Sequence, residues 1–421
     1  MDTIKTFEAG SHRSTFRFDR GGRRYIRVLV RAADVEGDIV APPLQLALVL
    51  DHSGSMTGPK WNLAKRAALE ALALLRPVDR FSLVVFSSAV HHLAVDLPAT
   101  AQSLALAAAG LAGVVAHGNT ALLPALQAGA DLLALHCIDG AVQRLLVLTD
   151  GQANIGPRDT GSFVASAAAW RKLGVSTSAF GLGEDFHEEL LVALTRAGQG
   201  QFTYVANEHA LVAALQREIA DAKVVVAQDV VIELRPSPGI RIRCISALDA
   251  AWAGDHFRVA IGALVAKQEM EVVLRADIGA GVIGSLATVE LRLCDADGPL
   301  PLPVRELQWL AADKAVCAAD VVDLGVARCA AEALAARAEI RMADANRRDD
   351  FDAVEVQLRR AVEALTALAG TDAAIQQHIE LLVALATRMR RKLSSSAMKE
   401  VYMSSVSRSR GRHSDGSKKL H

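Results

Sequence analysis

The chain has 421 residues, a length typical of two or three domains. Its 46 Lys and Arg and 47 Asp and Glu leave a net charge of −1, which excludes a protein that is basic throughout and built to coat nucleic acid. Hydrophobic residues make up 51% and charged residues 22%, so most of the chain can bury a core. The start has no apolar signal segment, and the five cysteines show no CxxC spacing, so we expect a cytoplasmic protein with reduced thiols.

Residues 12–40 are predicted to form strands. Segments 14–18 and 24–30 alternate apolar and polar residues, and Gly21-Gly22 between them predicts a hairpin turn. No helical pattern separates these segments. We therefore expect them to join a second group of strands at residues 223–305, where the helical period is lost and an antiparallel β-sandwich is predicted.

Residues 43–222 alternate short apolar runs with helical stretches. Each apolar run is followed by turn residues, as expected for strands that are buried on both faces of a parallel sheet. The alternation predicts a doubly wound, Rossmann-like α/β domain. The predicted strands are 44–50, 81–86, 145–148 and 175–180, and the predicted helices are 60–75, 121–135, 162–172 and 188–196.

The carboxyl-terminal part is predicted to contain helices and then a tail. Residues 306–395 have long Ala, Leu, Arg and Glu stretches with apolar residues at helical spacing, which predicts a helical hairpin or bundle. Residues 387–421 carry ten Lys or Arg, two acids and nine serines. We therefore predict a disordered, basic, Ser-rich tail at 396–421. It is either a solvated segment or an arm that contacts an acidic surface, a nucleic acid or a protein kinase.

Three clusters of oxygen-bearing side chains follow predicted strands or precede a predicted helix. The run Asp51-His52-Ser53-Gly54-Ser55 comes directly after the first buried strand, Thr120 precedes the helix at 121–135, and Asp150 follows the strand at 145–148. In an open parallel sheet, ligand sites form at the carboxyl ends of strands, near the point where strand order reverses. Carboxylates and hydroxyls without nearby His or Cys suit a hard cation, Mg²⁺ by default, with Mn²⁺ or Ca²⁺ as alternatives.

The order Asp-x-Ser-x-Ser, then a distant Thr and a distant Asp, resembles the metal-ion-dependent adhesion site of bacterial von Willebrand factor type A (VWA) domain proteins. The resemblance covers residues 43–222. It implies that Ser53, Ser55 and Thr120 contact the ion directly and that Asp51 and Asp150 act directly or through water. It also implies protein recognition, in which a partner's Asp or Glu completes the coordination, rather than catalysis.

The leading hypothesis is a non-enzymatic intracellular scaffold that binds an acidic partner through its metal ion. One alternative is a regulatory component of a bacterial kinase or phosphatase signalling, stress or defence system, with a modifiable Ser/Arg tail. Another is an adaptor of a separate AAA+ ATPase. A plain turn at Asp51–Ser55 is the competing structural interpretation, and no Gly-x-Ser-x-Gly sequence surrounds Ser53 to indicate a hydrolase.

Overall fold

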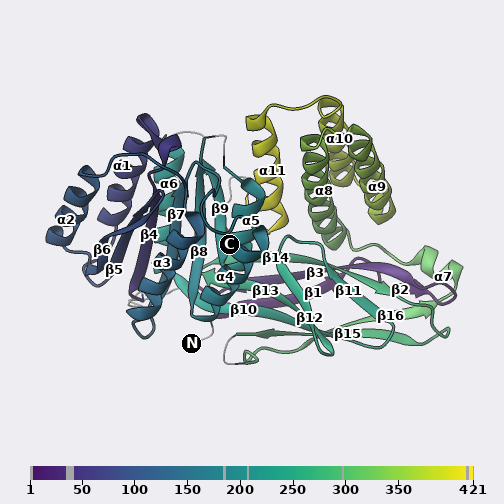
Figure 1. Cartoon of the computed structure of the whole chain (residues 1–421). Coiled ribbons are helices and arrows are strands. Elements are labelled where there is room, and N and C mark those ends of the chain that lie inside the picture. The colour runs from purple at the N-terminus through teal and green to yellow at the C-terminus, as the bar shows by residue number, and fades with distance from the viewer. Residues whose placement is uncertain are drawn as a thin grey trace. The chain divides into compact units, whose positions relative to one another are not determined.

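The computed structural model describes residues 3–34, 42–183, 186–205, 208–295, 298–413 and 417–420. The chain divides into two compact units: Glu36–Val225, and Met1–Val35 together with Val226–His421. Figure 1 shows the first unit as a sheet covered by helices and the second as paired sheets with a helical region. No helix within the described ranges has the length and apolar content that a membrane span requires.

The first unit is built on a six-stranded sheet. Its order is β6 (Val90–Pro98), β5 (Arg80–Phe86), β4 (Leu44–Asp51), β7 (Val142–Thr149), β8 (Val175–Leu182) and β9 (Gln199–Val205). All neighbours are parallel except β6, which pairs antiparallel with β5. All eight residues of β4 are buried, which explains why its sequence is continuously apolar rather than alternating.

Helices cover both faces of this sheet (Figure 1). One face packs against α1 (Pro59–Ala73), α2 (Ala101–Ala112) and α6 (Glu208–Lys223), which share one apolar core with it. The other face carries α3 (Leu122–Leu135), α4 (Thr160–Lys172) and α5 (Glu188–Ala197). Pro59 stands in the first turn of α1, where its missing N–H is not needed. The predicted doubly wound α/β fold is confirmed.

The second unit contains two sheets that enclose an apolar core. One sheet has the order β1 (Ile4–Ser11), β3 (Gly22–Ala32), β14 (Gln268–Ile278) and β11 (Ile240–Cys244), and β17 (Lys419–Leu420) pairs with β14. The other has the order β12 (Asp249–Ala253), β13 (His256–Val265), β10 (Val225–Pro236), β15 (Leu286–Cys294), β16 (Arg305–Ala312) and β2 (Thr15–Arg17). The amino-terminal strands therefore lie in the same sheets as the later strands.

Two boundaries differ from the predictions. The amino-terminal strands begin with β1, before residue 12, and residues 35–41 lie outside the described residues. The predicted helical region 306–395 opens with β16, because Trp309 and Ala311 alternate with exposed Gln308 and Leu310 and so form one buried face of a strand.

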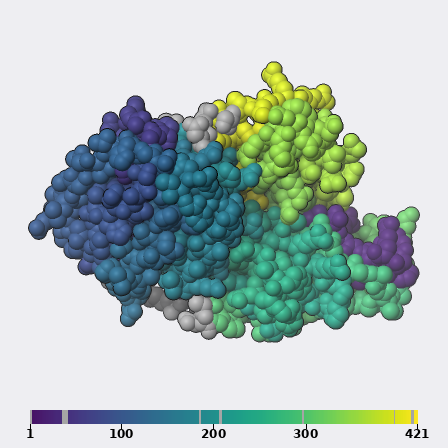
Figure 2. All heavy atoms as spheres, viewed as in Figure 1, coloured from purple at the N-terminus to yellow at the C-terminus, as the bar shows by residue number. Residues whose placement is uncertain are grey.

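The helical region follows β16 as α7 (Lys314–Ala319), α8 (Leu324–Arg347), α9 (Phe351–Ala369), α10 (Ala373–Arg388) and α11 (Ser395–Ser409). Asp323, Asp350 and Asp372 cap α8, α9 and α10 by accepting hydrogen bonds from backbone N–H groups of the first turn. Helix α8 packs on β3 and β14. Figure 2 shows the helical region, in light green, directly against the sandwich.

The predicted disordered tail at 396–421 is wrong for the segment that forms α11. Met398, Tyr402 and Val406 are spaced by four residues and form one buried helix face. Ser405 and Arg408 both donate hydrogen bonds to Glu339 of α8, and the guanidinium of Arg347 lies 5.5 Å from the ring of Tyr402. These contacts compensate for the polar composition. Residues 414–416 and 421 of the predicted tail lie outside the described residues.

Candidate metal-binding site

The candidate site lies where the strand order of the parallel sheet reverses. The chain leaves β4 through α1 and enters β5 on one side of β4, whereas β7 pairs with the other side. Asp51 is the last residue of β4, and Asp150 directly follows β7. Both side chains are fully buried. Because both strands are parallel, the two carboxylates reach the same edge of the sheet, at the position where α/β folds bind ligands.

The carboxylate of Asp51 is held in one orientation by two donors. Its Oδ1 accepts a hydrogen bond of 2.8 Å from the backbone N–H of Ser53, and its Oδ2 accepts one of 2.6 Å from Thr149 Oγ1. Burial raises the pKa of Asp51 to about 6. The hydrogen bonds from Thr149 and Ser53 lower this pKa, whereas the negative charge of Asp150 raises it further. A nearby cation would offset the cost of burying this charge.

A chain of polar contacts joins the loop after β4 to Asp150. Ser53 Oγ lies 3.1 Å from Ser55 Oγ, and Ser55 Oγ donates a hydrogen bond of 2.6 Å to Asp150 Oδ1. The other oxygen of Asp150 accepts from Nζ of Lys60, in the first turn of α1. Lys60 was not predicted as a site residue, because its contact with Asp150 depends on how α1 packs beside β7.

Thr120 is held in place by hydrogen bonds between its backbone and Asn154, in the loop after β7. Its N–H donates to Asn154 Oδ1 over 2.7 Å, and its carbonyl accepts from the N–H of Asn154 over 3.1 Å. The N–H of Gly54 donates to the carbonyl of Gly118 over 2.9 Å. Gly118 has φ of +81°, a conformation that favours glycine. The loop before α3 is thereby attached both to the loop after β4 and to the loop after β7.

Three oxygens from two distant segments of the chain surround Gly151. A Cβ placed there would lie 3.2 Å from Thr120 Oγ1, 3.4 Å from Ser55 Oγ and 3.7 Å from Asp51 Oδ2. With Ser53 and Asp150 linked to Ser55, the structure brings all five predicted residues together. Within the described residues, no group of three or more His, Cys, Asp and Glu side chains is arranged to hold a metal ion. The donors at this position are instead two carboxylates and three hydroxyls, an oxygen-only set that fits Mg²⁺.

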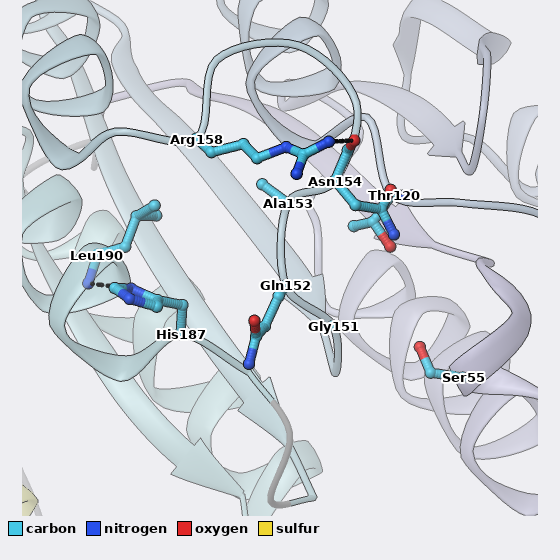
Figure 3. A pocket seen from close by; sticks show the side chains of 9 residues that line it. All are labelled: Ser55, Thr120, Gly151, Gln152, Ala153, Asn154, Arg158, His187 and Leu190. Atoms are coloured by element: carbon cyan, nitrogen blue, oxygen red, sulfur yellow. Dashed lines mark hydrogen bonds between the residues drawn. The ribbon is translucent and has the colours of Figure 1, made fainter.

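A cavity of about 670 Å³ borders these oxygens. Figure 3 shows Ser55 and Thr120 on one side of it and Gln152, Arg158 and His187 on the other. Arg158 is exposed and donates to the backbone carbonyl of Asn154. Because Arg158 and His187 stand on loops with no motif of their own, sequence reasoning missed them as lining residues.

His52, the residue after Asp51, points away from the oxygen cluster of the candidate site. His52 is buried, its Nδ1 lies 3.1 Å from the carbonyl of Val115, and its ring centroid is 5.9 Å from that of Trp61 and 5.4 Å from that of His117. Burial lowers the pKa of His52, so the ring is neutral near pH 7. His117 packs edge-on against His52.

Residues 45–218 match the von Willebrand factor type A domain family. An uncharacterized protein of Synechocystis sp. is 31% identical over 185 residues, which cover 44% of this chain and 43% of that protein. YfbK of Escherichia coli, also uncharacterized, is 26% identical over 219 residues, which cover 51% of this chain and 37% of YfbK. The matches thus span about two fifths of these relatives.

A similar fold is found in a solved structure titled von Willebrand factor type A from Catenulispora acidiphila. It is 20% identical, has a TM-score of 0.73, and the match covers 95% of this chain and 96% of that one. The chain therefore contains a VWA domain, and the predicted domain type is confirmed.

Proposed function

We propose that the VWA domain binds one divalent cation, Mg²⁺ by default, and that a carboxylate of a partner protein completes its coordination. Ser53, Ser55 and Thr120 would hold the ion directly, with Asp51 and Asp150 contacting it directly or through water. The observation that carries this proposal is the convergence of oxygens from the β4 end and its following loop with the oxygen of Thr120, around Gly151 at the wall of an open cavity.

The charge balance of the donor set supports an anionic ligand. Hydroxyls are neutral donors, and Asp150 already faces the ammonium of Lys60. The ion would therefore keep much of its electrophilicity and favour an incoming carboxylate. Arg158, on the cavity wall, adds a second positive group that suits a carboxylate. VWA domains commonly mediate protein–protein interactions, and we propose a non-enzymatic, cytoplasmic scaffold role for this chain.

The carboxylate preference is testable without knowing the partner. The full chain is loaded with Mn²⁺, and water-proton relaxation is followed while acetate is added, with acetamide as the neutral control. Acetate is expected to lower the relaxation enhancement by displacing coordinated water, and Arg158→Gln is expected to weaken this effect. Equal responses to acetate and acetamide would contradict the proposed ligand class.

The scaffold role has a separate test in native cell extract. Proteins captured by the immobilised full chain in Mg²⁺ are expected to be lost in EDTA and with Thr120→Ala. Arg144→Gln, a change at the opposite end of β7, serves as the matched control and should capture normally. Capture that persists both in EDTA and with Thr120→Ala would reject metal-dependent recognition.

The modifiable-tail alternative stays a prediction, but three serines of α11 are poor sites for modification. Ser405, Ser407 and Ser409 are buried in the second unit, so a kinase would reach them only after local unfolding. The AAA+ adaptor alternative concerns a separate chain and stays a prediction.

A further inference from the structure

A second cavity, of about 390 Å³, lies in the other unit, between the sandwich and the helical region. Its sheet side is formed by β3 and β14 and its helix side by α8 and α9. Five arginines line it, whereas Glu363 is the single acid among its lining residues. They are Arg23, Arg275, Arg337, Arg341 and Arg360. Arginine is thus the prevailing charged residue around this open cavity.

The sheet side of this cavity has more positive than negative charge. Asp277 lies 2.7 Å from Arg275, 3.5 Å from Arg23 and 3.8 Å from Arg243, so three guanidinium groups share one carboxylate. Tyr25 is directly across from Arg275 in the β3–β14 pairing. Only 5% of its surface is exposed, and its hydroxyl makes no hydrogen bond to any other described residue, which leaves a donor at the cavity wall.

The helix side adds two solvent-exposed cations that lack an acid partner among the described residues. Arg341 of α8 and Arg360 of α9 form no ion pair or side-chain hydrogen bond with any residue that the structure describes. Arg337 stands one turn before Arg341 on the same face of α8 and donates to the carbonyl of Cys244 over 3.1 Å. Like charges brought together in this way repel one another, and a multiply charged anion would relieve that repulsion.

We infer that this Arg-lined cavity binds a small molecule carrying two or more adjacent phosphate groups. Arginine forks match phosphate oxygens in pairs, and the five arginines of the lining outnumber the two nearby acids, Glu363 and Asp277. The walls of sheet and helix and the small residues Ala338, Ala361 and Ala364 leave room for a ligand of nucleotide size rather than a macromolecule. The site contains none of the five residues proposed for the metal, so it is independent of the proposed function.

The test is a calorimetric titration of the full chain with inorganic pyrophosphate in EDTA and low salt. EDTA removes divalent ions, so the metal site cannot contribute. We expect one saturable site in the wild type and roughly tenfold weaker binding in the double variant Arg341→Gln/Arg360→Gln. Arg359→Gln removes an exposed charge from the same helix without touching the cavity lining, and should bind as the wild type does. Thermal unfolding of each variant verifies that it is folded.

Added salt should weaken binding to the wild type more than to the double variant, because fewer charge contacts remain in the variant. Citrate distinguishes a polycarboxylate ligand from a polyphosphate. Absence of saturable pyrophosphate binding, equal loss in Arg359→Gln, or tighter binding of citrate than of pyrophosphate would overturn the inference.

Discussion

Ser55 donates a hydrogen bond of 2.6 Å to Asp150, 95 positions further along the chain. The contact joins the loop after β4 to the loop after β7 across the switch point of the sheet. Removing one partner from such a network leaves the other as a buried polar group without a hydrogen bond.

Lys60 pairs with Asp150 and would compete with the proposed cation for the charge of that carboxylate. In Lys60→Met that competition and the repulsion between the two cations are removed, so Mg²⁺ affinity should rise roughly three- to tenfold at low ionic strength. The measurement is displacement of Mn²⁺ by Mg²⁺, followed by electron paramagnetic resonance. Lys65→Met, on the same helix but 5.6 Å from the ring centroid of Trp61, is the matched control and should leave the affinity unchanged. Weaker Mg²⁺ binding in Lys60→Met would contradict the account.

Gly151→Ala should weaken cation binding because the new methyl group occupies the space among three oxygens. It would lie 3.2 Å from Thr120 Oγ1 and 3.4 Å from Ser55 Oγ, which forces the hydroxyls apart. We expect roughly a tenfold loss of Mn²⁺ affinity, about 1.4 kcal/mol. Gly161→Ala is the control, since its nearest contact is a side-chain oxygen of Asp159 in the first turn of α4. Equal Mn²⁺ affinities of Gly151→Ala and Gly161→Ala would show that the cation does not bind beside Gly151.

His12 makes the stability of the second unit depend on pH. Burial, with help from Arg24, lowers its pKa to about 4, and its Nδ1 accepts from the N–H of Tyr25 over 3.0 Å. Between pH 4 and pH 6.5 the unfolded chain binds a proton that the folded chain excludes, so the free energy of unfolding falls as pH falls through this window. The loss from pH 7.5 to pH 5 is about 2 kcal/mol.

His12→Asn keeps an acceptor near the Nδ1 position and removes the titration. Urea unfolding at the two pH values should therefore show about 2 kcal/mol less pH dependence in the variant than in the wild type. An unchanged difference between the two pH values would show that His12 does not carry the effect.

Tyr402 attaches α11 to the rest of its unit. Tyr402→Ala removes a buried ring and its contact with Arg347, and should lower the free energy of unfolding by about 2–4 kcal/mol. Ser404→Ala, a half-buried position on the same helix, should cost less than about 1 kcal/mol. Hydrogen exchange of the α11 amides provides the second readout. Rapid exchange of these amides in the wild type would favour the disordered tail predicted from composition.

Much of the first unit is predictable because buried parallel strands have continuous apolar sequences, as β4 does. The edge strands β6 and β9 are harder to predict from sequence, since β6 mixes exposed and half-buried residues and β9 opens with the polar run Gln199-Gly200-Gln201. The convergence of Asp51 and Asp150 follows from one rule, that the carboxyl ends of parallel strands share an edge. Thr120 follows no strand, and its place depends on the hydrogen bonds between its loop and Gly54 and Asn154.

The contacts that the sequence does not reveal depend on packing. Lys60 meets Asp150 only because of the rotation of α1 about its axis, and Arg158 reaches the cavity only through the path of its loop. The fold of α11 rests on Glu339, which accepts from two residues of an otherwise polar helix. The many serines and arginines of α11 predict disorder from composition, because composition contains no information about the partners of these side chains.

The most direct test of the central claim is a count of Mn²⁺ ions bound by the full chain, measured by electron paramagnetic resonance. The account predicts one saturable site in the wild type that Mg²⁺ displaces, and at least roughly tenfold weaker binding in both Asp51→Ala and Thr120→Ala. A wild-type chain that binds no Mn²⁺ at millimolar concentration, or variants that bind it as well as the wild type does, would contradict it.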